Sequence, residues 1–140
     1  MILVDVGVWL AAIWGRHVHH RVAKQWFDGR ADDLLLCRVT QMSLLRLISN
    51  PAIMAEDAVS RSEAWRIMDQ VWSDNRVLWA DEPDQLEAVF RVISAWNDKS
   101  HKLWTDDYLA AFAQASGASL ATLDTRMVNR YPSVRIDQVS

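Results

Sequence analysis

The first ten residues, Met1 to Leu10, read MILVDVGVWL and decide how the chain begins its fold. The apolar run Ile2–Val4 is typical of a short buried strand, and Asp5 follows it directly. A helix packed back on the sheet is predicted by apolar residues at helical spacing, namely Val8, Trp9, Ala12 and Ile13. We therefore expect a strand, an aspartate and a helix in immediate succession.

Outward from this stretch, strands alternate with helices along the chain. Leu34–Cys37 is apolar at every position, as in a strand of a parallel sheet that is buried on both faces. Further strands are expected over 77–80 and 119–123, with a fifth candidate over 134–136. Helices are expected over 19–27, from an N-cap at Thr40 to a stop at Asn50-Pro51, over 60–72, over 83–93 after a cap at Asp81, and over 106–116 before Gly117. This alternation predicts an α/β fold in which helices flank a central, mostly parallel sheet of four to five strands, all in one domain spanning 1–140.

Composition excludes several classes of protein. The 140 residues contain no apolar run long enough to span a membrane, and the N-terminus lacks the basic and apolar regions of a signal peptide. A single cysteine, Cys37, cannot form an internal disulfide and fits the reducing cytoplasm, where we expect a buried thiol. The net charge of −3 neither indicates nor excludes binding of nucleic acid. An apolar fraction of 51% with eight tryptophans is high for this length, which suggests that a partner or a second copy covers some surface.

Three aspartates stand where a predicted strand gives way to a helix: Asp5, Asp106 and Asp124. Taken singly, each is better explained as a helix cap, because a carboxylate there accepts hydrogen bonds from free backbone N–H groups. In an open α/β sheet, however, the carboxyl ends of the strands share one crevice. Carboxylates that meet there without a cationic partner are best tolerated around a divalent cation.

Four motifs carry a resemblance to a known family. They are ILVDVGVWL (2–10), TQMSLLRLISNP (40–51), LWTDDYLAA (103–111) and LATLD (120–124). In this order they resemble the PIN-domain ribonucleases, and among these the VapC-type toxins of bacterial toxin–antitoxin pairs. The resemblance spans essentially the whole chain.

The resemblance implies a function and a site. Asp5, Asp106 and Asp124 would hold Mg²⁺ or Mn²⁺, and a metal-activated water would cleave single-stranded RNA. Thr122 matches a hydroxyl position that orders the carboxylate of Asp124. The expected partners are a VapB-type antitoxin, which silences the enzyme, and a second copy in a homodimer.

The chain departs from the family pattern at two positions. Ser43 stands where many members have a glutamate, and Gly7 replaces a common Asn or Ser. Metal binding is then weaker, or another acid joins the site. Asp107 is the first candidate, with Glu63 and Asp98 behind it, whereas the alternative for Asp107 is a second acid complementing the helix dipole.

Other polar residues are candidates for contact with RNA. Arg46, Thr122 and Arg126 are the candidates for substrate binding, with a surface ion pair as the alternative for Arg46. A loop with Lys99, His101 and Lys102 precedes Asp106, and we expect either a solvated loop or a phosphate contact. The triplet of histidines at 17, 19 and 20 matches no zinc spacing and predicts a surface turn. Most tryptophans fall at core spacing, and those beside the acidic motifs, Trp9 and Trp104, are the ones to examine for stacking on bases.

Two rival functions remain open. A haloacid-dehalogenase-like phosphatase also begins with a strand that ends in aspartate, but it needs a second aspartate where Gly7 stands. A PIN fold that has lost its glutamate could instead serve as a catalytically weakened binding or regulatory module. Binding of Mg²⁺ separates this last hypothesis from the nuclease.

Overall fold

Five short parallel strands form the centre of the molecule, in the order β3-β2-β1-β4-β5. A computed structural model describes residues 1–140. The strands are β1 (Ile2–Val4), β2 (Leu34–Leu36), β3 (Val77–Trp79), β4 (Ser119–Thr122) and β5 (Ile136–Gln138). The predicted parallel α/β sheet is confirmed, with five strands.

The strands β1 and β2 are apolar on both faces because helices cover both faces of the sheet there. Successive side chains of a strand point to opposite sides. Ile2 and Val4 accordingly belong to one core cluster and Leu3 to the other, and β2 repeats the pattern with Leu35 opposite its two neighbours. This explains why the strands read as continuous apolar runs.

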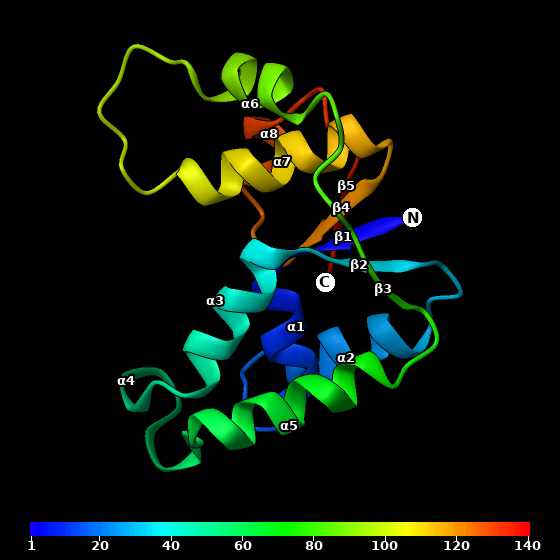
Figure 1. Cartoon of the computed structure of the whole chain (residues 1–140), viewed down its shortest axis with the longest axis vertical. Helices are drawn as coiled ribbons and strands as arrows, with labels where there is room; N and C mark the ends of the chain where they lie inside the picture. Colours follow the sequence, from blue (N-terminus) through cyan, green and yellow to red (C-terminus); the bar gives the residue numbers. More distant parts are fainter.

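Two layers of helices sandwich the sheet (Figure 1). The lower layer in that view holds α1 (Val6–Ile13), α2 (His20–Asp28), α3 (Arg38–Ile48), α4 (Pro51–Met54), the 3₁₀ turn η1 (Ala55–Asp57) and α5 (Arg61–Trp72). The upper layer holds α6 (Leu86–Ser94), α7 (Trp104–Ser116) and α8 (Met127–Arg130). No helix combines the length and apolar character that crossing a membrane requires.

The order of the strands reverses direction between β1 and β4. From β1 the chain moves outward through β2 to β3, and it then returns to the other side of β1 to form β4 and β5. β1 and β4 pair in parallel with Val4 opposite Ala121, so their carboxyl ends lie side by side. Such a reversal opens a crevice beyond the strand ends, where ligands bind in open α/β sheets.

Two predicted N-caps were wrong, and the expected fifth strand exists but starts two residues later. The helix α3 begins at Arg38 with Cys37 as its N-cap residue, so Thr40 lies buried inside the first turn, 3.6 Å from the Cys37 sulfur. The helix α6 begins only at Leu86 with Gln85 as its N-cap residue, and Asp81 accepts a hydrogen bond from Trp79 Nε1 at 3.0 Å instead of capping it. The last strand starts at Ile136, since Val134 is buried in the core before it. Gly117 ends α7 with a φ of 68°, as predicted for a C-terminal glycine.

Candidate active site

Asp5 and Asp124 follow the two strands that flank the reversal of the sheet. Asp5 lies between β1 and α1, and its backbone N–H donates to Ala121 O at 3.0 Å, which ties it to β4. Asp124 follows the end of β4, and Asp106 enters from the first turn of α7. The three aspartates singled out in the sequence therefore lie around one crevice, where their negative charges influence one another.

Asp5 is both a helix cap and a buried acid. Its Oδ1 accepts a hydrogen bond from the backbone N–H of Val6 at 2.7 Å, and its Oδ2 accepts one from Thr122 Oγ1 at 3.0 Å. Burial nevertheless raises the pKa of Asp5 to about 6, with the negative charges of Asp106 and Asp124 adding to the rise and the Thr122 hydrogen bond opposing it. A carboxylate that is costly to ionise and has no cationic partner favours the arrival of an external cation.

Thr122 holds the ends of the two strands together. Its hydroxyl donates to Asp5 and accepts from the backbone N–H of Asp124 at 3.0 Å. The side chain is fully buried, so it positions the acids and does not contact a substrate. The prediction of Thr122 as a substrate-binding residue is therefore wrong. Its expected ordering role falls on the carboxylate of Asp5 and on the backbone of Asp124.

Asp106 is half-buried and lies near a cation. Arg130 Nη1 is 3.4 Å from its Oδ2. Burial still raises the pKa of Asp106, because the loss of hydration and the charges of Asp124 and Asp107 outweigh the attraction of Arg130. For Asp106, as for Asp5, the surroundings make the ionised carboxylate less favourable than it is in water.

Asp124 shows the opposite behaviour because an arginine clasps it. Arg126 donates from Nε to Oδ1 and from Nη2 to Oδ2, each at 3.0 Å, and its backbone N–H donates to Oδ1 at 2.9 Å. These hydrogen bonds lower the pKa of Asp124 below its ordinary value. Arg126, predicted as a phosphate contact, is here the partner of an acid.

The donor chemistry suits a hard divalent cation, but the side chains have not gathered into a ligand cage. Three carboxylates are the type of ligand that Mg²⁺ and Mn²⁺ take in proteins. No three acidic, histidine or cysteine side chains are arranged so that they hold a metal ion as they stand. Two of the three acids face arginines instead, Asp106 facing Arg130 and Asp124 facing Arg126. The residues therefore fit a metal in kind, while two of the three carboxylates are paired with arginines in this structure.

The structure does not bring Asp107 to the three acids. Its carboxylate is buried and accepts a hydrogen bond from the hydroxyl of Tyr131, a contact that raises the pKa of the tyrosine together with burial. We therefore correct the expectation that Asp107 replaces the missing glutamate. Asp107 lies next to Asp106 on α7, but its hydrogen bond with Tyr131 connects α7 to the segment after α8.

The other candidate acids are also engaged elsewhere. Glu63 pairs with Arg66 on the exposed surface of α5, and Asp98 accepts from the backbone N–H of Ser100 at 3.0 Å in the loop before α7. Ser43, at the position of the expected glutamate, lines a pocket of about 510 Å³ with Arg46 and Thr105, the residue before Asp106. Arg46 has no ion-pair partner, so it remains free to contact an anion there.

The histidines, two tryptophans and Gly7 are the other positions that the sequence singled out. His17 and His19 lie in the predicted turn, where the backbone N–H of His19 donates to His17 Nδ1 at 3.0 Å. Trp9 is buried in the core, whereas Trp104 is exposed at the start of α7. A side chain at Gly7 would meet open space, so the fold itself does not require glycine there.

Sequence reasoning missed Arg130 and Tyr131, the residues that contact Asp106 and Asp107. The one available signal was the spacing of Arg126 and Arg130, which places two cations four residues apart after Asp124. A four-residue helix carries too little periodicity to be recognised, and the contacts to α7 span 24 residues.

Comparison with known proteins identifies the family of the chain. The family model described as "PIN domain" matches residues 2–132. Ribonuclease VapC41 of Mycobacterium tuberculosis is 38% identical over 131 residues, which cover 89% of this chain and 90% of that protein.

Solved structures show the same fold at low sequence identity. VapC20 of Mycobacterium tuberculosis, described as a Sarcin-Ricin loop cleaving toxin, superposes with a TM-score of 0.69 at 14% identity over 96% of this chain and 99% of VapC20. A chain of a toxin–antitoxin complex from Klebsiella pneumoniae gives a TM-score of 0.67 at 15% identity over 100% of this chain and 98% of its own length. The family model and the identity to VapC41 go further than the shared fold: this chain belongs to the PIN domain family and, within it, to the VapC-type ribonuclease toxins.

Proposed function

We propose that this VapC-type protein is a Mg²⁺-dependent endoribonuclease that hydrolyses single-stranded RNA at the crevice formed by Asp5, Asp106 and Asp124. The observation that carries the proposal is the meeting of three carboxylates at the reversal of the sheet, with Asp5 buried and its pKa raised to about 6. Acids whose ionised form is made unfavourable by burial are characteristic of functional sites.

The chain's own residues have distinct tasks in this reaction. Asp5, Asp106 and Asp124 would hold the ion, and Thr122 fixes the position of Asp5 by its hydrogen bond. A bound Mg²⁺ supplies positive charge to the scissile phosphate and makes a water molecule more acidic. Arg126 and Arg130 lie at the rim and would pass from the carboxylates to RNA phosphates, because a guanidinium group binds both anions in a forked geometry.

The test is cleavage of a fluorescent single-stranded RNA by the purified chain, with Mg²⁺ and with EDTA. We expect cleavage that EDTA abolishes and that Asp5→Asn and Asp124→Asn slow. Asp69→Asn, an exposed acid on α5, is the matched control and should cut normally. Undiminished cleavage in EDTA would contradict the proposal. Absence of both cleavage and Mg²⁺ binding would favour the catalytically weakened binding module.

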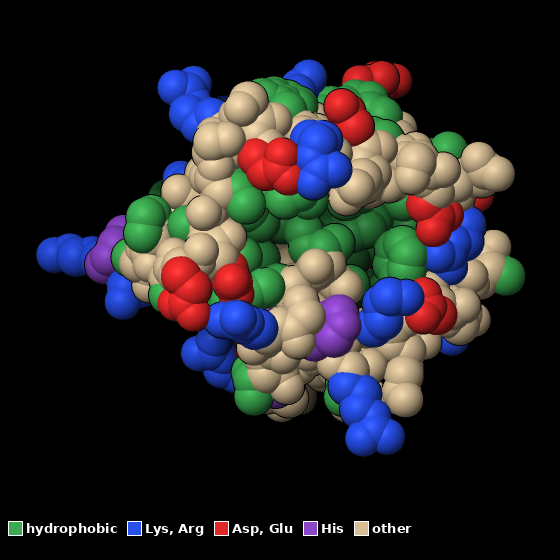
Figure 2. Space-filling view, turned by 90° about the horizontal axis from the view of Figure 1, so that it is seen from below, with side chains coloured by type: hydrophobic (Ala, Val, Ile, Leu, Met, Phe, Trp, Pro, Cys, Tyr) green, Lys and Arg blue, Asp and Glu red, His purple; other side chains and the backbone are tan.

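We also propose a VapB-type antitoxin as the protein partner, bound in an apolar groove on the lower layer of helices. The groove has a volume of about 580 Å³ and lies between α1, α2 and α5, with Ile13, Phe27 and Ile67 on its walls. Figure 2 shows an apolar hollow on this face, ringed by charged side chains. The groove is mostly apolar, and the buried Trp9 lies beneath it.

Ile67→Arg tests this groove by placing a charge on its apolar wall. We expect the variant to cleave RNA normally and to lose co-purification with a co-expressed VapB-type antitoxin. Val18→Arg, at an exposed apolar position outside the groove, is the control and should retain the partner. Retention of the antitoxin by Ile67→Arg would rule out this groove.

The expected homodimer stays a prediction. Exposed apolar side chains on α3 and α5, Met42 and Trp65, would be covered by a second copy. Sedimentation of the wild-type chain and of Trp65→Glu at several concentrations measures it. A monomer at all concentrations would contradict the prediction.

A further inference from the structure

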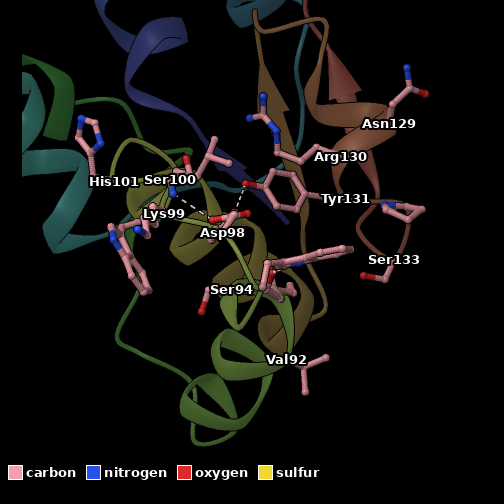
Figure 3. A pocket seen from close by; sticks show the side chains of 16 residues that line it. Val92, Ser94, Asp98, Lys99, Ser100, His101, Asn129, Arg130, Tyr131 and Ser133 are labelled. Atoms are coloured by element: carbon pink, nitrogen blue, oxygen red, sulfur yellow. Dashed lines mark hydrogen bonds between the residues drawn. The ribbon is translucent and has the colours of Figure 1, made fainter.

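A second cavity, lined by polar and aromatic side chains, adjoins the acidic crevice. It has a volume of about 740 Å³, within the range of ligand sites, and lies between the loop that joins α6 to α7 and the segment around α8. In Figure 3, Lys99, Ser100 and His101 line one side, and Arg130 and Tyr131 line the other. This is the loop that the sequence singled out as a candidate phosphate contact.

The cavity and the crevice share a wall. Arg130 lines the cavity, and its Nη1 is 3.4 Å from Asp106 Oδ2. Asp107, the neighbour of Asp106 on α7, also lines it. A chain bound across the three acids would therefore pass directly from the crevice into this cavity.

An indole ring is fixed at the cavity and left open to solvent. Trp96 Nε1 donates to Ile93 O at 2.8 Å, which fixes the ring, yet 74% of the residue is exposed. Its single polar group is satisfied within the chain, so the exposed surface is aromatic. Nucleic acid bases stack on such rings with little regard to sequence.

The charged groups suit a nucleotide better than a simple anion. Lys99 and His101 are exposed and have no acidic partner, so both can face phosphate oxygens. Asp98 is anchored to the backbone N–H of Ser100, and its carboxylate can accept from a base amino group. Cations, an acid and an indole around one cavity together match the phosphate, the polar edge and the face of a nucleotide.

We propose that this cavity binds a nucleotide of single-stranded RNA next to the cleaved phosphate, with its base stacked on Trp96 and its phosphate contacted by Lys99 and His101. This inference rests on the proposed ribonuclease function. It adds a substrate-binding site outside the acidic crevice and assigns the loop between α6 and α7 to substrate recognition.

Binding of a short 5′-labelled single-stranded RNA, measured by fluorescence anisotropy in EDTA, tests the site without cleavage. We expect Trp96→Ala to weaken binding about tenfold, within the range for loss of one stacked base. Trp96→Phe should restore most of the affinity. Trp79→Ala removes an exposed indole from the edge strand β3, outside this cavity, and should bind as the wild type does. Lys99→Ala should weaken binding and reduce its dependence on salt.

The outcomes distinguish failure of the cavity proposal from failure of the ribonuclease proposal. If the wild-type chain cuts RNA with Mg²⁺ while Trp96→Ala and Lys99→Ala bind RNA normally, the cavity proposal is overturned and the nuclease stands. If the wild-type chain neither cuts nor binds RNA, both fail. If the variants bind RNA normally but lose the antitoxin, the cavity is a protein-docking site and the proposal is overturned. Thermal unfolding of each variant, followed by circular dichroism, confirms that the fold is retained.

Discussion

Asp5 and Asp124 follow neighbouring strands, yet their surroundings give them opposite properties. Asp5 is largely buried, has no cation beside it, and its pKa is raised to about 6. Asp124 is more open, is clasped by Arg126, and its pKa is lowered. Arg126 therefore balances the negative charge on the Asp124 side of the crevice, whereas the negative charge on the Asp5 side has no cation beside it. An external cation gains most by binding at the Asp5 side.

The largest expected effect is on catalysis. Asp5→Asn should reduce the rate of RNA cleavage on the order of 10³-fold, because it removes the negative charge at the position with no substitute. Asp124→Asn should reduce the rate less, since Arg126 already neutralises this acid in the free protein. Rates with saturating Mg²⁺ measure the difference. Equal losses would show that the asymmetry has no role in catalysis.

The pH dependence of stability should reveal the buried acid directly. The folded-state pKa of Asp5, about 6, lies above its ordinary value of 3.8, so the fold binds the proton more tightly than the unfolded chain does. The resulting stabilisation is present below about pH 4 and is lost as the pH rises through 6; it amounts to about 3 kcal/mol.

Urea unfolding in EDTA across this range tests that sign. The free energy of unfolding of the wild type should fall between pH 4 and pH 6 relative to that of Asp5→Asn, in which this titration is absent. Asp124 acts in the opposite direction at lower pH, because its stabilising pair with Arg126 is lost when the carboxylate is protonated. Parallel profiles for the two proteins would show that Asp5 titrates normally.

Thr122 links the two sides, and its removal should cost stability. Thr122→Val keeps the shape of the side chain but deletes the hydrogen bonds to Asp5 and from Asp124. Leaving buried polar groups unpaired costs about 1–3 kcal/mol. Thr122→Ser retains the hydroxyl and should recover most of the loss. A Thr122→Val protein as stable as the wild type would contradict the linking role.

The smallest expected effect concerns the cation that clasps Asp124. Arg126→Ala should tighten Mg²⁺ binding about two- to fivefold, as expected for release of an exposed ion pair. Calorimetric titration measures the affinity, and Arg91→Ala, which breaks the exposed pair with Glu87, is the control. A higher KM for RNA in Arg126→Ala would show that the guanidinium also contacts the substrate. Weaker Mg²⁺ binding would contradict competition between the arginine and the ion.

Local patterns predicted most of the fold and the acids of the site. Ile2–Asp5 combines an apolar strand with a cap residue, and both features act within a few residues of chain. The contacts that the sequence did not reveal are long-range. Tyr131 reaches Asp107 across 24 positions, and no local spacing indicates that this acid is already engaged. Asp81 and Thr40 were misplaced because caps resemble one another in sequence, whereas packing decides where each helix begins.

The pKa of the Asp5 carboxyl group, measured by NMR in EDTA and again with Mg²⁺, tests the central claim most directly. The account predicts a pKa of about 6 without metal and a clear fall when Mg²⁺ is added, because a bound cation favours the ionised form. An ordinary pKa in EDTA, or a value that Mg²⁺ leaves unchanged, would contradict a metal site at Asp5.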